Sequence, residues 1–441
     1  MTNQMKKDLE NARLLLFSHF GISPTKAKQY LDILEKKPEK VTTLLVKLSE
    51  SIQKLYYTFK ANSLEDINRM AKERVEEWKN TIGPLTIHDF VTMSKQWNIP
   101  IDAFIDRKIT PEIIKQMLDY FVIGQEKYKI MLSVVFYSYF MNRQCSTVTS
   151  PQSRLLVCGP SGSGKTYGIQ VLSRLFHVPF VIQHCNSLVQ EGIIGTTISD
   201  GFNSLSSQGW KEEDIKHAVV CFDEFDKLFD KGDVFKSAGT YNMRIVNEML
   251  NIIDDDGEID VNIVEDHRMK TVKMSTRKMM FVFTGVFEGV KKDKSKDKNI
   301  HIGFIRHEEP AEEKLKLDID KNPTIEDFIE YGVKPEVMGR VRNIVFLNEL
   351  TEDDMVALFD LGVNSPFNDF GQYFSQNGIN AILTDDGKRT LAKLACERKL
   401  GVRGLKSIIQ QILLEDMYDL EVGPEKILKV TKQYIMDNLR K

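Results

Sequence analysis

The sequence has little of what marks secreted, membrane-spanning or metal-stapled proteins. Only five of its 441 residues are cysteines. They are scattered and form no C-x-x-C pair, which argues against a disulfide framework or a zinc site of the usual spacing. The longest apolar run, from Met131 to Met141, is interrupted by two serines and is too short to cross a bilayer. The N-terminus leads into an amphipathic helical pattern and does not read as a signal peptide. We therefore expect a cytoplasmic protein with reduced thiols and no membrane partner.

An excess of one charge sign is also missing. The 60 Lys and Arg residues nearly balance the 63 Asp and Glu residues, which gives a formal net charge of −3. This balance argues against a protein whose main task is to neutralise nucleic-acid phosphates or an anionic membrane. Residues 1–60 do carry a local basic excess. A solvated helical surface explains it better than a nucleic-acid patch, which is kept as the alternative.

Three regions differ in their hydrophobic patterns. Residues 1–105 repeat apolar side chains at three- and four-residue spacing, which predicts an all-helical N-terminal domain of unknown role. Residues 106–348 alternate short apolar runs with helical patterns, the pattern of an α/β domain with a parallel sheet and flanking helices. The predicted strands are Arg154–Cys158, Pro179–Ile182, Ala218–Phe222, Met279–Thr284 and Asn343–Leu347.

Residues 349–441 predict a small α+β domain. A helix N-cap pattern begins at Thr351, and strands are expected at Ile379–Leu383 and Lys426–Val430, with a helix at Leu405–Met417 between them. No internal repeat is present, and the one low-complexity stretch is the lysine-rich segment 291–298, which we expect to be a mobile loop.

A phosphate-binding loop follows the first predicted strand. Its residues are Gly159, Pro160, Ser161, Gly162, Ser163, Gly164, Lys165 and Thr166. This is the pattern G-x-x-x-x-G-K-[ST] between a strand and a helix. The glycines let backbone N–H groups surround phosphate oxygens, and the helix adds its positive dipole end. Lys165 is expected to contact the β- and γ-phosphates of ATP, and the Thr166 hydroxyl to ligate Mg²⁺.

Two acidic residues end another predicted strand, at Asp223 and Glu224. The carboxyl ends of parallel strands face the crevice where ligands bind. Asp223 is the candidate carboxylate for Mg²⁺, and Glu224 is the candidate base that polarises a water for attack on the γ-phosphate. Alone, this pair would be an ordinary acidic turn; beside the phosphate loop it predicts ATP hydrolysis.

The sequence resembles the AAA+ unfoldases of the ClpX and HslU group. Residues 222–227, FDEFDK, resemble the Walker B block of that family. Further blocks fall in the family's order at residues 120–125 (YFVIGQ), at Thr284, at residues 335–340 (PEVMGR) and at residues 401–407 (GVRGLKS). The resemblance spans residues 108–420, most of the chain.

The resemblance implies roles for several residues. Val122 and Ile123 would flank adenine, and Thr284 would help to position the lytic water. Arg340 would be the arginine finger that reaches the nucleotide of a neighbouring subunit, and Arg403 would contact the nucleotide from the small domain. Assembly into a ring, a hexamer in this family, and the unfolding of protein substrates are implied in the same way.

Two loops depart from the family or match it only briefly. Gly192, Ile193, Ile194 and Gly195 occupy the place of the family's G-Y-V-G pore loop, where Ile193 lacks the aromatic ring. The alternative is that Ile193 and Ile194 are ordinary strand or core residues. Ile302, Gly303 and Phe304 match the tripeptide with which ClpX docks onto the ClpP peptidase; the alternative is an incidental loop anchor.

Some features of the family are missing. No cysteine precedes Cys145, so the zinc-binding N-terminal domain of ClpX is not found, and the basic loop at the pore entrance is replaced by an acidic segment around residues 254–258. We interpret that segment as a solvated turn and not as a calcium loop. The interpretation is a ring-forming, Mg²⁺-dependent unfoldase. The alternatives are an AAA+ motor or loader that acts on nucleic-acid complexes and, with less support, a scaffold that does not hydrolyse ATP.

Overall fold

The structure is a computed structural model in which the chain divides into two compact units, Met1–Lys108 and Ile109–Lys441. It describes residues 72–73, 75–76, 87–97, 100–105, 108–144, 153–189, 195–229, 236–265, 268–290, 323–361, 365–399, 401–420 and 426–439. In the first unit it describes helix α5 (Ile87–Trp97), the short 3-10 helix η1 (Ile101–Ala103) and further helical residues at 72–73 and 75–76. The rest of the helical prediction for residues 1–105 lies outside the described residues.

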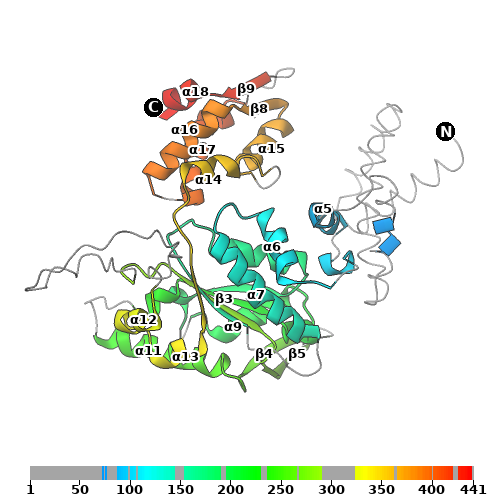
Figure 1. The fold of residues 1–441 in the computed structure, drawn as a ribbon, viewed down its shortest axis with the longest axis vertical. Helices are drawn as coiled ribbons and strands as arrows, with labels where there is room; N and C mark the ends of the chain where they lie inside the picture. The colour runs from blue at the N-terminus through cyan, green and yellow to red at the C-terminus, as the bar shows by residue number, and fades with distance from the viewer. Residues whose placement is uncertain are drawn as a thin grey trace, which may run out of the picture. The chain divides into compact units, whose positions relative to one another are not determined.

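The second unit is built on a parallel sheet of five strands (Figure 1). The strand order is β2-β3-β6-β1-β7, and each neighbouring pair is parallel. The strands are β1 (Arg154–Cys158), β2 (Phe180–His184), β3 (Val219–Asp223), β6 (Met280–Gly285) and β7 (Asn343–Phe346). The α/β fold with a parallel sheet is therefore confirmed, with strand ends shifted by one or two residues from the prediction.

Burial explains why these segments form central strands. All five residues of β1 and all six of β6 are buried, and a strand covered on both faces needs apolar side chains on both. The helices of this sheet region are α6 (Pro111–Asp119), α7 (Glu126–Gln144), α8 (Tyr167–Leu175), α9 (Ile198–Ser207), α10 (Glu212–Ile215), α11 (Lys236–Ile252), α12 (Ile325–Tyr331) and α13 (Pro335–Arg340), with the 3-10 helices η2 (Cys185–Ser187) and η3 (Phe225–Leu228). Thr110 caps α6, because its hydroxyl accepts a hydrogen bond from the Ile113 N–H.

An antiparallel hairpin, β4 (Glu258–Glu265) with β5 (Arg268–Ser275), follows α11 and was not predicted. Its buried residues Ile259, Val261 and Ile263 alternate with polar ones, so a period-two signal was present in the sequence. The acidic residues 254–256 precede the hairpin. The predicted solvated turn is found there, because residues 254–256 are exposed and lie in a turn; what was not predicted is that Asp254 and Asp255 each pair with an arginine.

A second hydrophobic core gathers the C-terminal elements, drawn from gold to red in Figure 1. These elements are α14 (Glu352–Leu358), α15 (Asn368–Gln376), β8 (Ile379–Leu383), α16 (Asp385–Glu397), α17 (Gly401–Tyr418), β9 (Lys426–Val430) and α18 (Lys432–Leu439). Strands β8 and β9 pair in parallel at the residues predicted for them. Thr351 forms the predicted N-cap of α14 in a capping box with Asp354.

One packed core of the second unit thus lies at the parallel sheet, and another gathers around α16 and α17. The finer division into domains at residues 105/106 and 348/349 stays a prediction. None of the described helices has both the length and the apolar character that a bilayer crossing requires.

Candidate functional site: a nucleotide-sized cavity between two cores

A cavity of about 730 Å³ lies where the sheet core and the second core meet. This volume falls within the range of small-molecule sites. The predicted site residues that line it are Val122, Ile123, Ser161, Gly162, Ser163, Gly164, Lys165, Thr166, Asp223, Glu224 and Arg403. Among the other predicted residues that the structure describes, Gly159, Pro160, Thr284 and Arg340 are not part of its wall. The fold therefore brings most of the nucleotide-contacting candidates to one place.

The loop between β1 and α8 supplies the anion-binding face of the cavity. Gly164 has a φ of +92°, a left-handed conformation that a side chain would strain. Thr166 follows at the N-cap of α8, so the amide groups of the first helical turn point toward the loop. The backbone of residues 159–166 therefore has the form that cradles phosphate oxygens.

Lys165 is held over this loop by neutral acceptors. Its Nζ donates to the carbonyl oxygens of Gly159 and Pro160, both at 2.8 Å. Burial lowers the pKa of Lys165, while Asp223 acts in the opposite direction. Because carbonyl dipoles carry no net charge, the ammonium keeps a full positive charge for an anionic ligand.

Asp223 ends β3 at the carboxyl edge of the sheet, as predicted. Its Oδ1 accepts hydrogen bonds from the Glu224 N–H at 3.0 Å and from the Thr284 hydroxyl. Thr284 is fully buried, so it lies behind Asp223 and orients that carboxylate. Its predicted contact with a lytic water stays a prediction. Carboxylate and hydroxyl oxygens are ligands that Mg²⁺ prefers, and Asp223 and Thr166 present them to the same cavity.

Glu224 turns out of the strand with a left-handed backbone, at φ +58° and ψ +37°. Such a conformation costs a non-glycine residue about 1–2 kcal/mol and is enriched at functional sites. It points the chain from β3 into η3 and leaves the Glu224 side chain on the cavity wall. A carboxylate beside a phosphate site can accept a proton from an attacking water.

The second core contributes the opposite wall through the first turn of α17. The Val402 N–H donates to the Gly162 carbonyl at 3.2 Å. Gly401 has a φ of +57°, and a Cβ there would lie only 2.7 Å from the Gly162 oxygen. Only glycine fits this approach, so α17 begins directly on the phosphate loop, with Arg403 on the cavity wall.

The remaining wall is apolar. Val122 and Ile123, the residues predicted to flank adenine, line it together with Phe121, Leu358 and Pro366. An aromatic purine ring needs apolar surface on its two faces, and this end of the cavity supplies it. The cavity thus has one cationic end and one apolar end.

Several lining residues were missed by the sequence reading. Asp226 is 3% exposed and lies three residues after Asp223; its place in the same acidic block was the available signal. Lys406 lies three residues after Arg403 on α17 and forms an ion pair with Asp369 at 3.0 Å. Spacing of three places Lys406 on the same helix face as Arg403, which could have marked it as a second cation.

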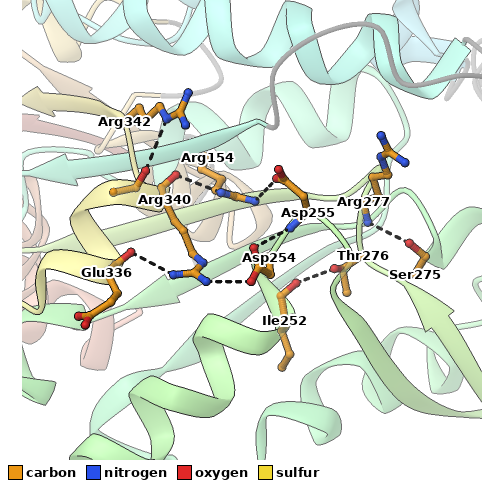
Figure 2. A network of polar contacts seen from close by, with 11 residues as sticks. Arg154, Ile252, Asp254, Asp255, Ser275, Thr276, Arg277, Glu336, Arg340 and Arg342 are labelled. Atoms are coloured by element: carbon orange, nitrogen blue, oxygen red, sulfur yellow. Dashed lines mark hydrogen bonds and ion pairs between the residues drawn. The ribbon is translucent and has the colours of Figure 1, made fainter.

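Arg340 lies outside the cavity of its own chain. Its Nη2 donates to Asp254 at 2.8 Å, next to an ion pair between Arg154 and Asp255 (Figure 2). The pKa of Arg340 is raised chiefly by the hydrogen bond to Asp254. Its predicted role as an arginine finger in a neighbouring site stays a prediction.

The two predicted loops lie at or beyond the edge of the described residues. Gly192, Ile193 and Ile194 of the predicted pore loop lie outside them, as do Ile302, Gly303 and Phe304 of the predicted docking motif. Gly195 is described. The segments that flank the predicted pore loop are bridged, because the Val189 N–H donates to the Thr196 carbonyl at 2.8 Å.

Comparisons with known proteins match both cores. Residues 150–344 match the family model of the AAA domain (Cdc48 subfamily), and residues 350–426 match that of the C-terminal, D2-small domain of ClpB protein. The chain is also similar to proteins named ATP-dependent Clp protease ATP-binding subunit ClpX. The one from Bacteroides thetaiotaomicron is 27% identical over 345 residues, which cover 75% of this chain and 82% of the relative. The one from Treponema denticola is 28% identical over 340 residues, with 74% and 81% covered.

A third relative, named ClpX 2 and found in Wolinella succinogenes, is 25% identical over 338 residues, which cover 74% of this chain and 82% of the relative. The two family models cover the cores on either side of the cavity.

Proposed function

The chain is an AAA+ ATPase of the Clp type, and from this premise we propose that it forms a ring that unfolds or remodels proteins by pulling them through a central pore. A hexamer is the expected ring. The observation that carries the proposal is the cavity, because its walls come from two separately packed cores. A ligand bound there ties the relative position of the cores to its own chemical state.

In this proposal, residues of one chain bind and cleave ATP. Lys165 and Arg403 hold phosphate oxygens from the two walls of the cavity. Thr166 and Asp223 hold Mg²⁺, which neutralises phosphate charge when it is bound. Glu224 takes a proton from the attacking water. The buried Thr284 hydroxyl holds the carboxylate of Asp223 in place.

Arg340 is proposed to complete the site of the adjoining subunit. Its position outside the cavity of its own chain supports this role. If Arg340 binds a phosphate, the phosphate must then belong to a nucleotide held by another chain. Arginine fingers of this kind raise hydrolysis about 10³–10⁵-fold in other phosphoryl-transfer systems. Hydrolysis would then depend on assembly of the ring.

Delivery of unfolded chains to a ClpP-type peptidase is the second part of the proposal. Its support is the tripeptide Ile302-Gly303-Phe304 and the similarity to proteins named as subunits of the Clp protease. Replacing Phe304 by Ala should abolish stimulation by a peptidase ring and leave ATPase activity intact. The neighbouring substitution Ile305→Ala is the matched control, and equal proteolysis by both variants would remove the docking role.

The main test uses a folded fluorescent client that carries an unstructured tail. With ATP and Mg²⁺, light scattering should give the mass of a hexamer, and client fluorescence should fall. With Glu224→Gln, the ring and ATP binding should persist while the fluorescence stays constant. A protein that remains monomeric and leaves the client folded would contradict the proposal.

Action on nucleic-acid complexes is the alternative function. Near-neutral charge argues against it, although AAA+ modules serve such roles elsewhere. The discriminating measurement is the ATPase rate with an unfolded protein and with single-stranded DNA. Stimulation by DNA alone would replace the unfoldase proposal.

A further inference from the structure

The turn that joins α11 to the β4–β5 hairpin is a fixed part of the fold. The Gly257 N–H donates to the Asp254 carbonyl at 3.0 Å, and the buried Thr276 hydroxyl donates to the Ile252 carbonyl. A Cβ on Gly257 would lie 2.4 Å from the Ile252 oxygen, so no larger residue fits there. The turn therefore holds the side chains of residues 254–256 on a backbone that is fixed by hydrogen bonds and close packing.

Asp254 places one carboxylate oxygen on Arg340. Its Oδ2 accepts from the Arg340 Nη2 at 2.8 Å, and its Oδ1 accepts from the Asp255 N–H at 3.0 Å (Figure 2). These hydrogen bonds hold the pKa of Asp254 below its ordinary value, with the one from Arg340 as the largest cause. The carboxylate is therefore charged and oriented at neutral pH.

Arg154 fixes the backbone on the other side of the same cluster. Its side chain is only 8% exposed; Nη2 pairs with Asp255 at 3.1 Å, and Nη1 donates to the carbonyl of Arg340 at 3.2 Å. Arg154 is also the first residue of β1, the strand that leads into the phosphate loop. Arg340 is thus held at its main chain by Arg154 and at its side chain by Asp254.

We propose that Asp254 is the positioning residue for Arg340: it orients the guanidinium so that the remaining N–H groups of Nη1 and Nη2 can meet a phosphate of the adjoining subunit. This inference rests on the proposed role of Arg340 in a neighbouring site. A free arginine side chain has many rotamers, and fixing them before the phosphate arrives lowers the entropy cost of the transition state. Nη2 donates to Asp254 and Nη1 donates to the Glu336 carbonyl at 3.4 Å, and each of these nitrogens carries two N–H groups.

Exposure shows why this contact orients the finger without blocking it. The Arg340 side chain is 31% exposed and that of Asp254 is 51% exposed. Partly exposed ion pairs contribute little net binding, so a triphosphate with several negative charges is not excluded by a single carboxylate. The contact restricts the direction of the Arg340 guanidinium more strongly than it prevents the guanidinium from leaving Asp254.

The test compares Asp254→Asn with Asp256→Asn in the full-length chain. Asp256 belongs to the same turn, is exposed, and makes no ion pair with another described residue. Asp254→Asn should lower kcat of the assembled protein about tenfold and leave the KM for ATP unchanged, because misplacement of a catalytic group lowers turnover and not ground-state binding. Asp256→Asn should match the wild type, and Asp254→Glu should recover part of the loss.

A double-mutant cycle separates positioning from general stability. In the Arg340→Ala background, Asp254→Asn should cause no further fall in kcat, because the group that it positions is gone. Equal falls in both backgrounds, or unchanged or faster turnover in Asp254→Asn alone, would overturn the proposal. Thermal unfolding and ring mass, measured for each variant, should equal those of the wild type; a variant that loses them refutes a role limited to positioning.

The two levels of inference fail differently. If Arg340→Ala itself leaves turnover intact, the proposed finger is wrong and the positioning role ends with it. If Arg340→Ala abolishes turnover and Asp254→Asn does not change it, only the positioning role is wrong.

Discussion

Lys165 and Arg340 are both cations that are expected to meet phosphate, yet the fold satisfies their charges in different ways. Lys165 donates to two backbone carbonyls, which carry no net charge, and its pKa is lowered by burial. Arg340 is paired with the carboxylate of Asp254, and its pKa is raised. The first arrangement leaves the positive charge of Lys165 available to an anion inside the cavity of one chain. The second keeps a cation oriented at a surface, away from that cavity.

This difference suggests a division of labour. Lys165 and the contact of α17 with the phosphate loop should control whether ATP binds, whereas Glu224 and Arg340 should control how fast it is cleaved. Three substitutions test that division, and a fourth tests how the phosphate loop is supported; they are given in order of decreasing effect.

Arg340→Ala should have the largest effect. We expect kcat of the assembled ATPase to fall about 10³–10⁵-fold with little change in ATP affinity, because the finger acts on the transition state of another chain. Steady-state ATPase assays and equilibrium nucleotide binding measure the two quantities. Arg342→Ala, two residues away and exposed, is the control and should retain activity. A parallel loss of ATP binding in Arg340→Ala would break the comparison.

Glu224→Gln should come second. Loss of a general base lowers turnover by about 10²–10⁴-fold, while the amide keeps the size of the side chain. ATP binding, measured by calorimetry, should remain at the wild-type level. Glu288→Gln, an exposed change beyond the end of β6, is the matched control. Wild-type turnover in Glu224→Gln would refute the assignment of the base.

Gly401→Ala should weaken ATP binding about tenfold. The left-handed backbone at Gly401 strains a residue with a Cβ by about 1–2 kcal/mol, and the new methyl would meet the Gly162 carbonyl. Binding of a slowly hydrolysed ATP analogue measures the loss. The control is Gly371→Ala on α15, where a Cβ would meet nothing within 4 Å. Equal affinities for the two variants would show that α17 does not need its contact with the phosphate loop.

Tyr128→Phe should have the smallest effect. The fully buried Tyr128 hydroxyl donates to the Lys165 carbonyl at 2.9 Å, and its removal should lower the free energy of unfolding by about 1 kcal/mol. Urea denaturation measures this change. Tyr418→Phe is the control, because Tyr418 is 87% exposed. A Tyr128→Phe protein as stable as the control would show that this hydrogen bond does not support the phosphate loop.

Much of the fold could be predicted because its signals are local. The strands of the parallel sheet are continuous apolar runs, and the phosphate loop lies between a strand and a helix in sequence as in space. β8 and β9 were predicted at their observed residues for the same reason. The hairpin of β4 and β5 was missed although its buried residues alternate. Because the segment before the hairpin is rich in aspartate, the sequence favoured a solvated turn there and the strands were not recognised.

The surroundings of Arg340 could not be predicted, because they join residues far apart in the chain. Asp254 is 86 residues from Arg340. Arg154 is 186 residues away from it. No periodicity or motif connects such residues; only the packing of α13 and the turn after α11 brings them together. Thr284 illustrates the same limit, because its residue type was recognised while its burial behind Asp223 depends on the register of β3 and β6.

The hydrogen bond from Val402 to Gly162 has a practical consequence for following nucleotide exchange. Its amide proton is protected only while the start of α17 rests on the phosphate loop. Hydrogen–deuterium exchange at this single amide would therefore report how often the two cores separate, and hence how freely spent ADP can leave, without any attached label.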